Sequence, residues 1–438
     1  MQVNQKRYGH RFLTVLLVLV LGMQTLPVSG AMGEAVTLRI VDIGRMSDWR
    51  IPVGFQEQPP TYQMEEIDTG WDDIGNKLTE SWLYSHPDDW DIARINTDDC
   101  SLAALCEAGL LLDLRQVESL AGEFDAMYPK VLEALSYEGG IYGIPISIYG
   151  SASQLTRGQA EAWEQLGFSE ADRPRTFAEV CDLAVRYAAI PNMDRKGTVF
   201  NYNESQVHTE LLFYFIDLYS AKFSDENGNI SYDTELFRKG IADALTATNA
   251  LKVDPKLRPL KDGGFFEMIS VASSTIFSPD HTYFHVQMED ESIIPAKLSM
   301  VVVNRNTAHL SEVLHFAKAY QQEDAPYFAK SLKVLDDETL LALFHQSYDE
   351  DIAAQIYQKE DQSVIDRLEA KRALEDVESM YPRAMLDHYA QNIAPYLTFP
   401  KRPYADLNSL LPKVSAGKAS VEDLIQTLQA AADAQRRP

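Results

Sequence analysis

Residues 87–114 read PDDWDIARINTDDCSLAALCEAGLLLDL, which is the pattern of a strand, a polar loop and a helix in that order. The apolar run from Trp90 to Ile95 has the length and composition of a buried strand. After the polar loop, Leu102, Leu105 and Cys106 recur at intervals of three and four residues, which predicts a helix with Asp98 or Asp99 as its N-cap. A strand followed directly by a helix is typical of an α/β fold.

Similar patterns occur on both sides of this segment. Val36 to Ile43 and Thr61 to Ile67 predict two earlier strands, and Leu298 to Val303 predicts a later strand that is again followed by a polar turn and a helix. Between Arg157 and Leu251 the apolar periodicity is mostly helical. In such folds ligands bind beyond the carboxyl ends of the strands, so the loops after residues 43, 67 and 95 are the first places to expect a site.

Composition narrows the classes of partner. The chain has 438 residues, and 65 Asp plus Glu against 39 Lys plus Arg give a formal charge of −26. A chain of this length is expected to form more than one lobe, and its negative charge argues against nucleic acid as a partner and leaves neutral or cationic ligands open. The odd number of cysteines cannot pair fully, and we interpret all three as core or cap residues. They are Cys100, Cys106 and Cys181.

The N-terminal residues have the pattern of a cleaved signal peptide. Three basic residues precede an apolar run from Phe12 to Met23, which is too short to span a bilayer, and small residues at Ser29 and Ala31 suit cleavage after Ala31. We therefore expect residues 1–31 to be removed and the protein to be secreted, at the extracellular face of the membrane or in the periplasm. No cysteine follows the apolar run, so a lipid anchor there is not predicted and the means of retention stays open.

Sequence signatures of catalysis and of metal binding are missing. There is no Gly-x-Ser-x-Gly elbow, His-Glu-x-x-His helix, Walker loop, dinucleotide glycine motif or Cys-x-x-Cys pair. His281 and His285 have the spacing of zinc ligands on a helix, but Pro279 and the alternating pattern around them oppose a helix. The turn beginning at Asp225 lacks the glycine and the final glutamate of a calcium loop. We predict no catalytic residues, no metal site and no cofactor.

Six segments resemble, in order and spacing, the extracellular solute-binding proteins of ABC importers, in the group that includes maltose-binding protein. They are residues 87–92, 102–114, 137–145, 163–167 together with 174–180, 301–307 and 417–424. The resemblance covers nearly the whole chain after residue 31 and implies an α/β, two-lobed periplasmic-binding-protein-like (type II) fold with hinge crossovers. The implied first lobe comprises residues 32–147 and 297–345. The implied second lobe, mostly helical, comprises residues 148–296 and 346–438.

The same resemblance implies a function. Such a protein is a monomer that captures a small-molecule solute, here a sugar, in the cleft between its lobes and presents it to the ABC permease membrane subunits. Two departures weaken that inference: residues 44–58 leave little room for the usual first loop and helix, and the anchor cysteine is missing. Two alternatives therefore stay open. One is a secreted ligand-binding sensor or scaffold that has lost transport, and the other is an exported glycan-active enzyme that uses paired carboxylates.

Aromatic and hydrogen-bonding side chains in the expected loops are the candidate sugar contacts, because sugar C–H faces lie on aromatic rings and hydroxyls bond to charged or amide groups. The candidates are Trp49, Arg50, Asp68, Trp71, Asn96, Asp98, Tyr149 and Tyr283. Trp49 lies in a loop bounded by glycine and proline, where few core positions are available. The others have structural alternatives: Trp71 as a staple for the following helix, Asp98 as a helix cap and Tyr283 as a core residue.

Overall fold

A computed structural model describes most of the chain between Val36 and Gln435. The described residues are 36–43, 55, 59–70, 78–155, 163–164, 166–190, 209–225, 229–251, 267–271, 277, 282–284, 286–358, 362–376, 378, 383–400 and 407–435. Within these ranges no helix is both long enough and apolar enough to cross a membrane. The predicted signal peptide lies outside the described residues and stays a prediction.

A mixed sheet organises the fold, and its strands follow the order β2-β1-β3-β11-β6-β7, with β12 beside β11 and β8 beside β6. Its strands are β1 (Thr37–Val41), β2 (Gln63–Ile67), β3 (Ile92–Asn96), β6 (Gly143–Leu155), β7 (Glu267–Ser270), β8 (Thr282–Phe284), β11 (Ile294–Val303) and β12 (Leu397–Thr398). Strands β1, β2 and β3 run parallel, whereas β11 runs antiparallel to β3 and to β6. The four strands predicted from the apolar runs are confirmed.

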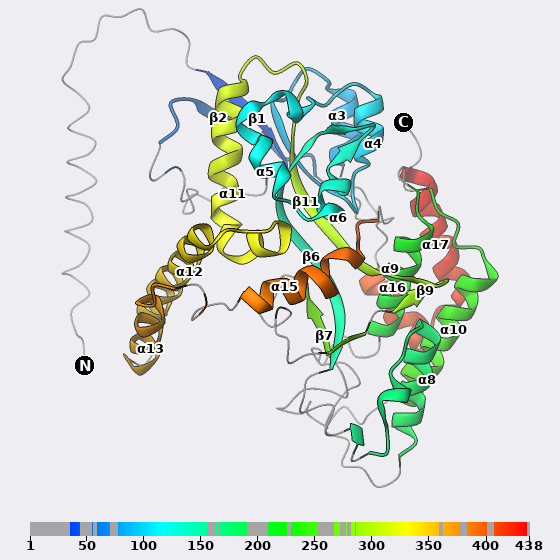
Figure 1. Ribbon diagram of the computed structural model, residues 1–438. Helices are drawn as coiled ribbons and strands as arrows, with labels where there is room; N and C mark the ends of the chain where they lie inside the picture. Colours follow the sequence, from blue (N-terminus) through cyan, green and yellow to red (C-terminus); the bar gives the residue numbers. More distant parts are fainter. Residues whose placement is uncertain are drawn as a thin grey trace, which may run out of the picture.

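Two long strands cross between two bodies. The first half of β6 pairs with β11 beside the parallel strands, and its second half pairs with β7 and β8. Strand β11 returns in the opposite direction and reaches β3. The short strand β12 pairs with the start of β11. The chain that leads into β12 belongs to the first of the two buried clusters described below, and the chain that follows it belongs to the second, so β12 marks a third connection between the two bodies. Figure 1 shows β6 and β11 running together through the middle of the molecule.

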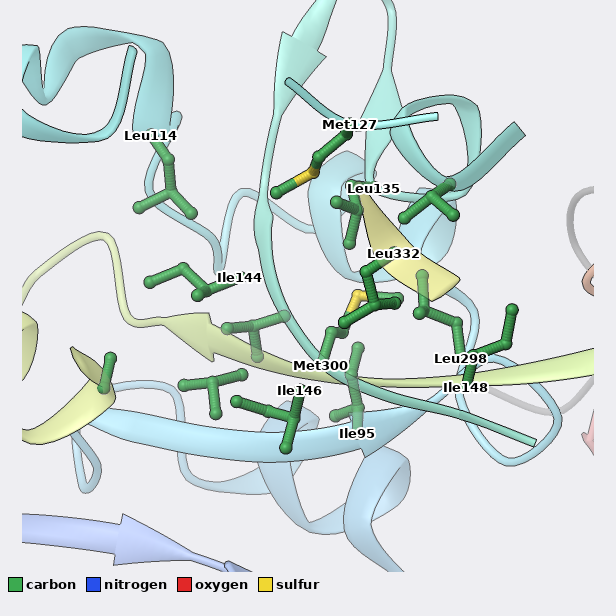
Figure 2. Close-up of a cluster of buried hydrophobic side chains, with 14 of the residues drawn as sticks. Ile95, Leu114, Met127, Leu135, Ile144, Ile146, Ile148, Leu298, Met300 and Leu332 are labelled. Atoms are coloured by element: carbon green, nitrogen blue, oxygen red, sulfur yellow. The ribbon is translucent and has the colours of Figure 1, made fainter. Parts of the chain in front are cut away.

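The first buried cluster surrounds the parallel strands. Its helices are α3 (Thr79–Ser85), α4 (Leu102–Glu107), α5 (Ala121–Asp125), α6 (Pro129–Ala134), α11 (Leu310–Leu332), α12 (Asp337–Gln358) and α15 (Arg383–Asn392), with short 3₁₀ turns at Leu114–Gln116, Glu118–Leu120 and Ala394–Tyr396. A further helix, α13 (Gln362–Arg372), packs on α12. Figure 2 shows Ile95, Ile148, Leu298 and Met300 of the central strands beside Met127, Leu135 and Leu332 from the surrounding segments. Helices α12 and α13 form a hairpin that projects from this body (Figure 1).

The second buried cluster is mostly helical. Its helices are α8 (Phe177–Ala188), α9 (Glu210–Phe223), α10 (Glu235–Ala250), α16 (Leu407–Ser415) and α17 (Val421–Gln435), with a 3₁₀ turn at Glu170–Asp172 and the strand pair β9 (Gln287–Met288) and β10 (Glu291–Ser292). A similar small hairpin in the first body joins β4 (Ser136–Tyr137) to β5 (Gly140–Ile141). The second cluster shares no residue with the first. Two separate cores joined by crossing strands form the predicted two-lobed α/β architecture.

The exact lobe boundaries stay a proposal. The prediction grouped residues 346–438 with the second lobe, yet the segment from Leu386 to Leu397 contributes to the first buried cluster. The reason is aromatic packing: Tyr389 is fully buried, stacks on Phe277 at 4.4 Å and lies 5.5 Å from Tyr128. Only the chain beyond this segment joins the second cluster.

Helix caps test the local predictions. Thr176 caps α8, and Glu179 completes the predicted capping box. The predicted N-cap of α4 is wrong, because Ser101 caps that helix and neither Asp98 nor Asp99 does. Hydrogen bonds between Thr97 and Leu298 still hold the chain to β11 at this point, so the helix begins only after a further turn. None of the three cysteines forms a disulfide, as predicted.

Candidate functional site

A cleft of about 470 Å³ opens where the crossing strands leave the first lobe. Residues from three central strands line it, together with one residue of the loop after β3, one of α9 and one of the third connection. They are Arg94, Asn96, Asp98, Tyr149, Gly150, Asp217, Pro295, Ala296, Lys297 and Pro400. Because Asp217 belongs to the helical lobe and Asn96 to the end of β3, both lobes contribute to this cleft. The cleft therefore lies where a two-lobed protein holds a ligand.

Strand register explains why these side chains meet. Residues directly opposite each other in a sheet point to the same face. Asn96 lies opposite Ser299, and Tyr149 lies opposite Lys297, two residues before Ser299. These four side chains thus share one face of the sheet. The opposite face carries the apolar side chains of Leu298 and Met300 shown in Figure 2.

Arg94 fixes the floor of the cleft. Its Nε donates to Ser299 Oγ at 2.8 Å, and Nη1 donates to Tyr320 Oη at 3.0 Å and to the carbonyl of Ile43 at 3.4 Å. Tyr320 also donates to that carbonyl at 2.7 Å. The guanidinium therefore ties the end of β1, strand β11 and helix α11 together, and a bound ligand would meet a rigid polar surface.

Charged and amide groups stand above this floor. Lys297 Nζ lies 3.3 Å from Asp98 Oδ2, and Asn96 Nδ2 donates to Asp99 at 2.8 Å. Asn96 Oδ1 is buried and, among the described residues, accepts no hydrogen bond. With two cations and two carboxylates, the cleft lining has no formal net charge. A neutral ligand rich in hydroxyl groups matches such a lining, because each charged group offers a charge-assisted hydrogen bond without leaving an excess of one sign.

Tyr149 supplies the aromatic surface. Its side chain is 41% exposed, which is unusual for a large ring at the centre of a sheet. The ring meets Phe328 of α11 edge-on, with centroids 5.4 Å apart. The neighbouring Gly150 lets β6 and β11 approach closely, since a Cβ there would lie 2.6 Å from the carbonyl oxygen of Pro295. The ring is thus held from one side and open to the cleft on the other.

The structure brings three of the eight predicted contacts together in this cleft: Asn96, Asp98 and Tyr149. Asp68 does not line it. It follows β2, two strands away from β3, and accepts a hydrogen bond from the amide of Gly70 at 3.0 Å. The backbone of Tyr283 pairs with Gln154 in β8, but its side chain lies outside what the structure describes. Trp49, Arg50 and Trp71 also lie outside the described residues.

Three charged residues of the cleft were missed by the sequence analysis: Arg94, Asp217 and Lys297. Arg94 and Lys297 interrupt the mainly apolar strands β3 and β11, and Asp217 interrupts the apolar middle of α9, whose other charged residues lie near its ends. A single charge in a buried strand or helix is costly unless it has partners or faces a cavity. That signal was present in the sequence, and it would have identified all three.

Glu210 lies two helical turns before Asp217 on the same face of α9 and is only 8% exposed. Among the described residues its Oε1 accepts no hydrogen bond, and burial raises the pKa of Glu210 to about 8. A folded-state pKa above the ordinary value means that the native protein binds the extra proton. The contribution of Glu210 to the free energy of unfolding should therefore be fully present below about pH 4 and should be lost as the pH rises towards 8.

We expect Glu210→Gln to remove this pH dependence. The variant should be more stable than the parent by about 2 kcal/mol at pH 8 and equally stable at pH 4, because an amide carries no desolvation penalty for charge. Urea unfolding at the two pH values measures this. Equal stabilisation at both values would show that titration is not the cause.

No family model and no curated protein matches the sequence. Solved structures do match. A chitin oligosaccharide binding protein aligns with a TM-score of 0.52 at 14% identity, over 92% of this chain and 98% of its own. An ABC transporter solute-binding protein from Agrobacterium vitis S4, with bound D-mannitol, aligns with a TM-score of 0.50 at 11% identity, over 92% and 98%. The chain has the two-lobed solute-binding-protein fold. At these identities the likeness establishes the fold alone, and the cleft at the crossing strands is the site that this fold makes available.

Proposed function

We propose that the protein is the extracellular substrate-binding component of an ABC transporter and that it captures a carbohydrate in the cleft between its lobes. It would be exported by the signal peptide of residues 1–31, act as a monomer and present its ligand to the permease subunits. The observation that carries this proposal is the cleft itself, in which the exposed ring of Tyr149 stands beside the polar groups of Asn96, Asp98 and Lys297.

The chemistry of the cleft supports a sugar. An aromatic ring accepts the C–H face of a pyranose, and amide and charged groups bond to its hydroxyls. The volume of about 470 Å³ falls within the range of small-molecule sites. The matched structures that are named for a chitin oligosaccharide and for D-mannitol are binding proteins and not enzymes. The contacts from both lobes would favour the closed form when a ligand is bound.

The experiment is a thermal-shift screen of the purified protein, followed by calorimetric titration of each hit. The panel comprises chitobiose to chitotetraose, maltotriose, mannitol and free monosaccharides. A ligand at one hundred times its Kd stabilises the folded state by about 2.7 kcal/mol, so a true ligand should raise the Tm of a chain of this length by roughly 3 °C. Thin-layer analysis of the same mixtures tests the enzymatic alternative, in which the sugar would be cleaved.

Tyr149→Ala should lower the affinity for the hit at least a hundredfold, because it removes the stacking surface and leaves the polar contacts unaligned. The unliganded Tm should change little, since the side chain is 41% exposed. Tyr149→Phe keeps the ring and should retain most of the affinity. If the alanine variant binds as well as the parent, the sugar is held elsewhere.

A further inference from the structure

The charges that line the cleft are unevenly distributed. Arg94 and Lys297 stand on the strands that form its floor. Asp98 lies in the loop after β3, and Asp217 lies on α9 in the second lobe. Lys297 is paired with Asp98 at 3.3 Å. The formal charges of the lining sum to zero, yet the floor beneath the carboxylates is cationic.

Arg94 has no carboxylate partner among the described residues. Its Nε and Nη1 donate to three neutral oxygen atoms, those of Ser299, Tyr320 and Ile43. Seven of the other ten arginines that the structure describes form an ion pair, in a chain with 65 Asp plus Glu against 39 Lys plus Arg. The missing counter-ion is therefore a feature of this site and does not reflect a shortage of acidic residues.

One nitrogen of Arg94 remains for a ligand. Nη2 donates to none of the described residues, and the side chain lines the cleft. A neutral sugar that covers this partly buried guanidinium would displace water from the charge without supplying a counter-ion, which is costly. A carboxylate on the ligand removes that cost and accepts charge-assisted hydrogen bonds.

Asn96, two residues further along β3, lacks a donor where Arg94 lacks an acceptor. Its Nδ2 donates to Asp99 at 2.8 Å, and its buried Oδ1 accepts no hydrogen bond within the described part of the chain. A ligand hydroxyl is able to donate to this oxygen. Tyr149 adds an aromatic surface that is 41% exposed. A sugar that carries a carboxylate, hydroxyl groups and an apolar ring face satisfies all three side chains.

We propose that the carbohydrate captured in the cleft is a uronic acid and that Arg94 binds its carboxylate. This proposal rests on the proposed function, because it assigns the class of sugar to the same cleft. A neutral sugar also matches a lining without net charge, but it leaves Arg94 without a counter-ion. The net charge of −26 repels an anion at long range. The preference for the acid therefore comes from contact with the floor of the cleft.

The first test uses the parent protein and ligands that differ only at C6. Glucuronate, galacturonate and mannuronate are each titrated calorimetrically at neutral pH, beside the uncharged amide of the same acid and the corresponding hexose. We expect at least one uronate to bind about tenfold to hundredfold more tightly than its amide, since hydrogen bonds between charged groups are the stronger ones. Equal Kd values for every acid and its amide, or binding of the neutral sugars alone, would overturn the proposal.

The second test removes the charge of the floor. In Arg94→Gln the Kd of the amide divided by the Kd of the acid should fall to about one. Because Arg94 also ties β11 to α11, this variant is less stable, but a ratio measured within one variant is insensitive to a general loss of affinity. Arg94→Lys keeps the charge without the planar fork and should keep a smaller preference for the acid.

Arg305→Gln is the matched control. Arg305 lies on the exposed turn after β11, outside the lining of the cleft, and its removal makes the same change of net charge. This variant should keep the parental ratio of Kd values. A preference for the acid that persists in Arg94→Gln would show that another group binds the carboxylate, and the assignment to Arg94 would be wrong.

The outcomes separate this proposal from the proposed function. If neutral sugars bind and no uronate is preferred over its amide, the uronate assignment is wrong and the proposed function stands. If neither the uronates nor any sugar of the earlier screen binds, the proposed function fails and the assignment fails with it.

Discussion

Replacing Gly240 by alanine is expected to destabilise the helical lobe by about 3 kcal/mol, although alanine is the better helix former. A Cβ at this position of α10 would overlap the ring of Phe215 on α9. That ring cannot move aside: it is 2% exposed and lies 4.8 Å from Phe177 and 5.5 Å from Phe237, centroid to centroid. Close packing leaves no void to absorb the added methyl group.

Gly122→Ala is the matched control. Gly122 also lies inside a helix, α5, but a Cβ there has nothing within 4 Å. This variant should be neutral or more stable by up to about 1 kcal/mol, since only helix propensity changes. Urea unfolding of both variants, followed by circular dichroism, measures the difference. If Gly240→Ala is as stable as Gly122→Ala, helices α9 and α10 are able to move apart, and the contact between Gly240 and Phe215 is not tight.

Asn304→Ala is expected to cost about 4 kcal/mol in the first lobe. Asn304 is 1% exposed, and its Nδ2 donates to the carbonyls of Pro87 and Trp90 at 2.8 and 2.9 Å. Its Oδ1 accepts from the amide of Asn306 at 2.8 Å. Truncation leaves three backbone groups without these partners at the point where the end of β11 is joined to the start of β3.

The control for this prediction stands two residues away. Asn306 Nδ2 donates to Asp88 Oδ1 at 2.9 Å on the exposed surface. Removing an exposed amide costs little, because water replaces its partner, so Asn306→Ala should cost less than about 1 kcal/mol. Unfolding curves for the two alanine variants make the comparison. Similar decreases in the free energy of unfolding for both variants would mean that burial does not strengthen the hydrogen bonds of Asn304.

Much of the framework was predictable because each strand has its own apolar run. Strands β1, β3 and β11 are mostly buried, and their β-branched and aliphatic residues, although interrupted by Arg39, Arg94 and Lys297, indicate strands directly. Strand β6 was harder, because its second half, from Gly150 onward, is small and polar and carries no strand period. Its role as a crossing strand followed only from the resemblance to a known fold.

The site was predictable where the loop after a strand is short. Asn96 ends β3 and Asp98 lies just beyond it, and the rule that ligands meet the carboxyl ends of parallel strands led to both residues, which line the cleft. Their contact with a ligand stays a prediction. The same rule also selected Asp68, which does not line this cleft, because β2 lies at the edge of the sheet, away from the crossing strands. Lys297 and Asp217 reach the cleft from elements far apart in sequence, and only tertiary packing brings them together.

Interleaving of the two buried clusters along the chain has a consequence for biosynthesis. The core around β1 stays incomplete until Leu397 has been added, and the core around α9 waits for Ala432. Neither lobe can complete its core while most of the polypeptide is still being translated, which takes roughly 20–90 s at about 5–20 residues per second. Nascent chains should therefore leave the ribosome largely unstructured, and this late, non-local assembly should be slow.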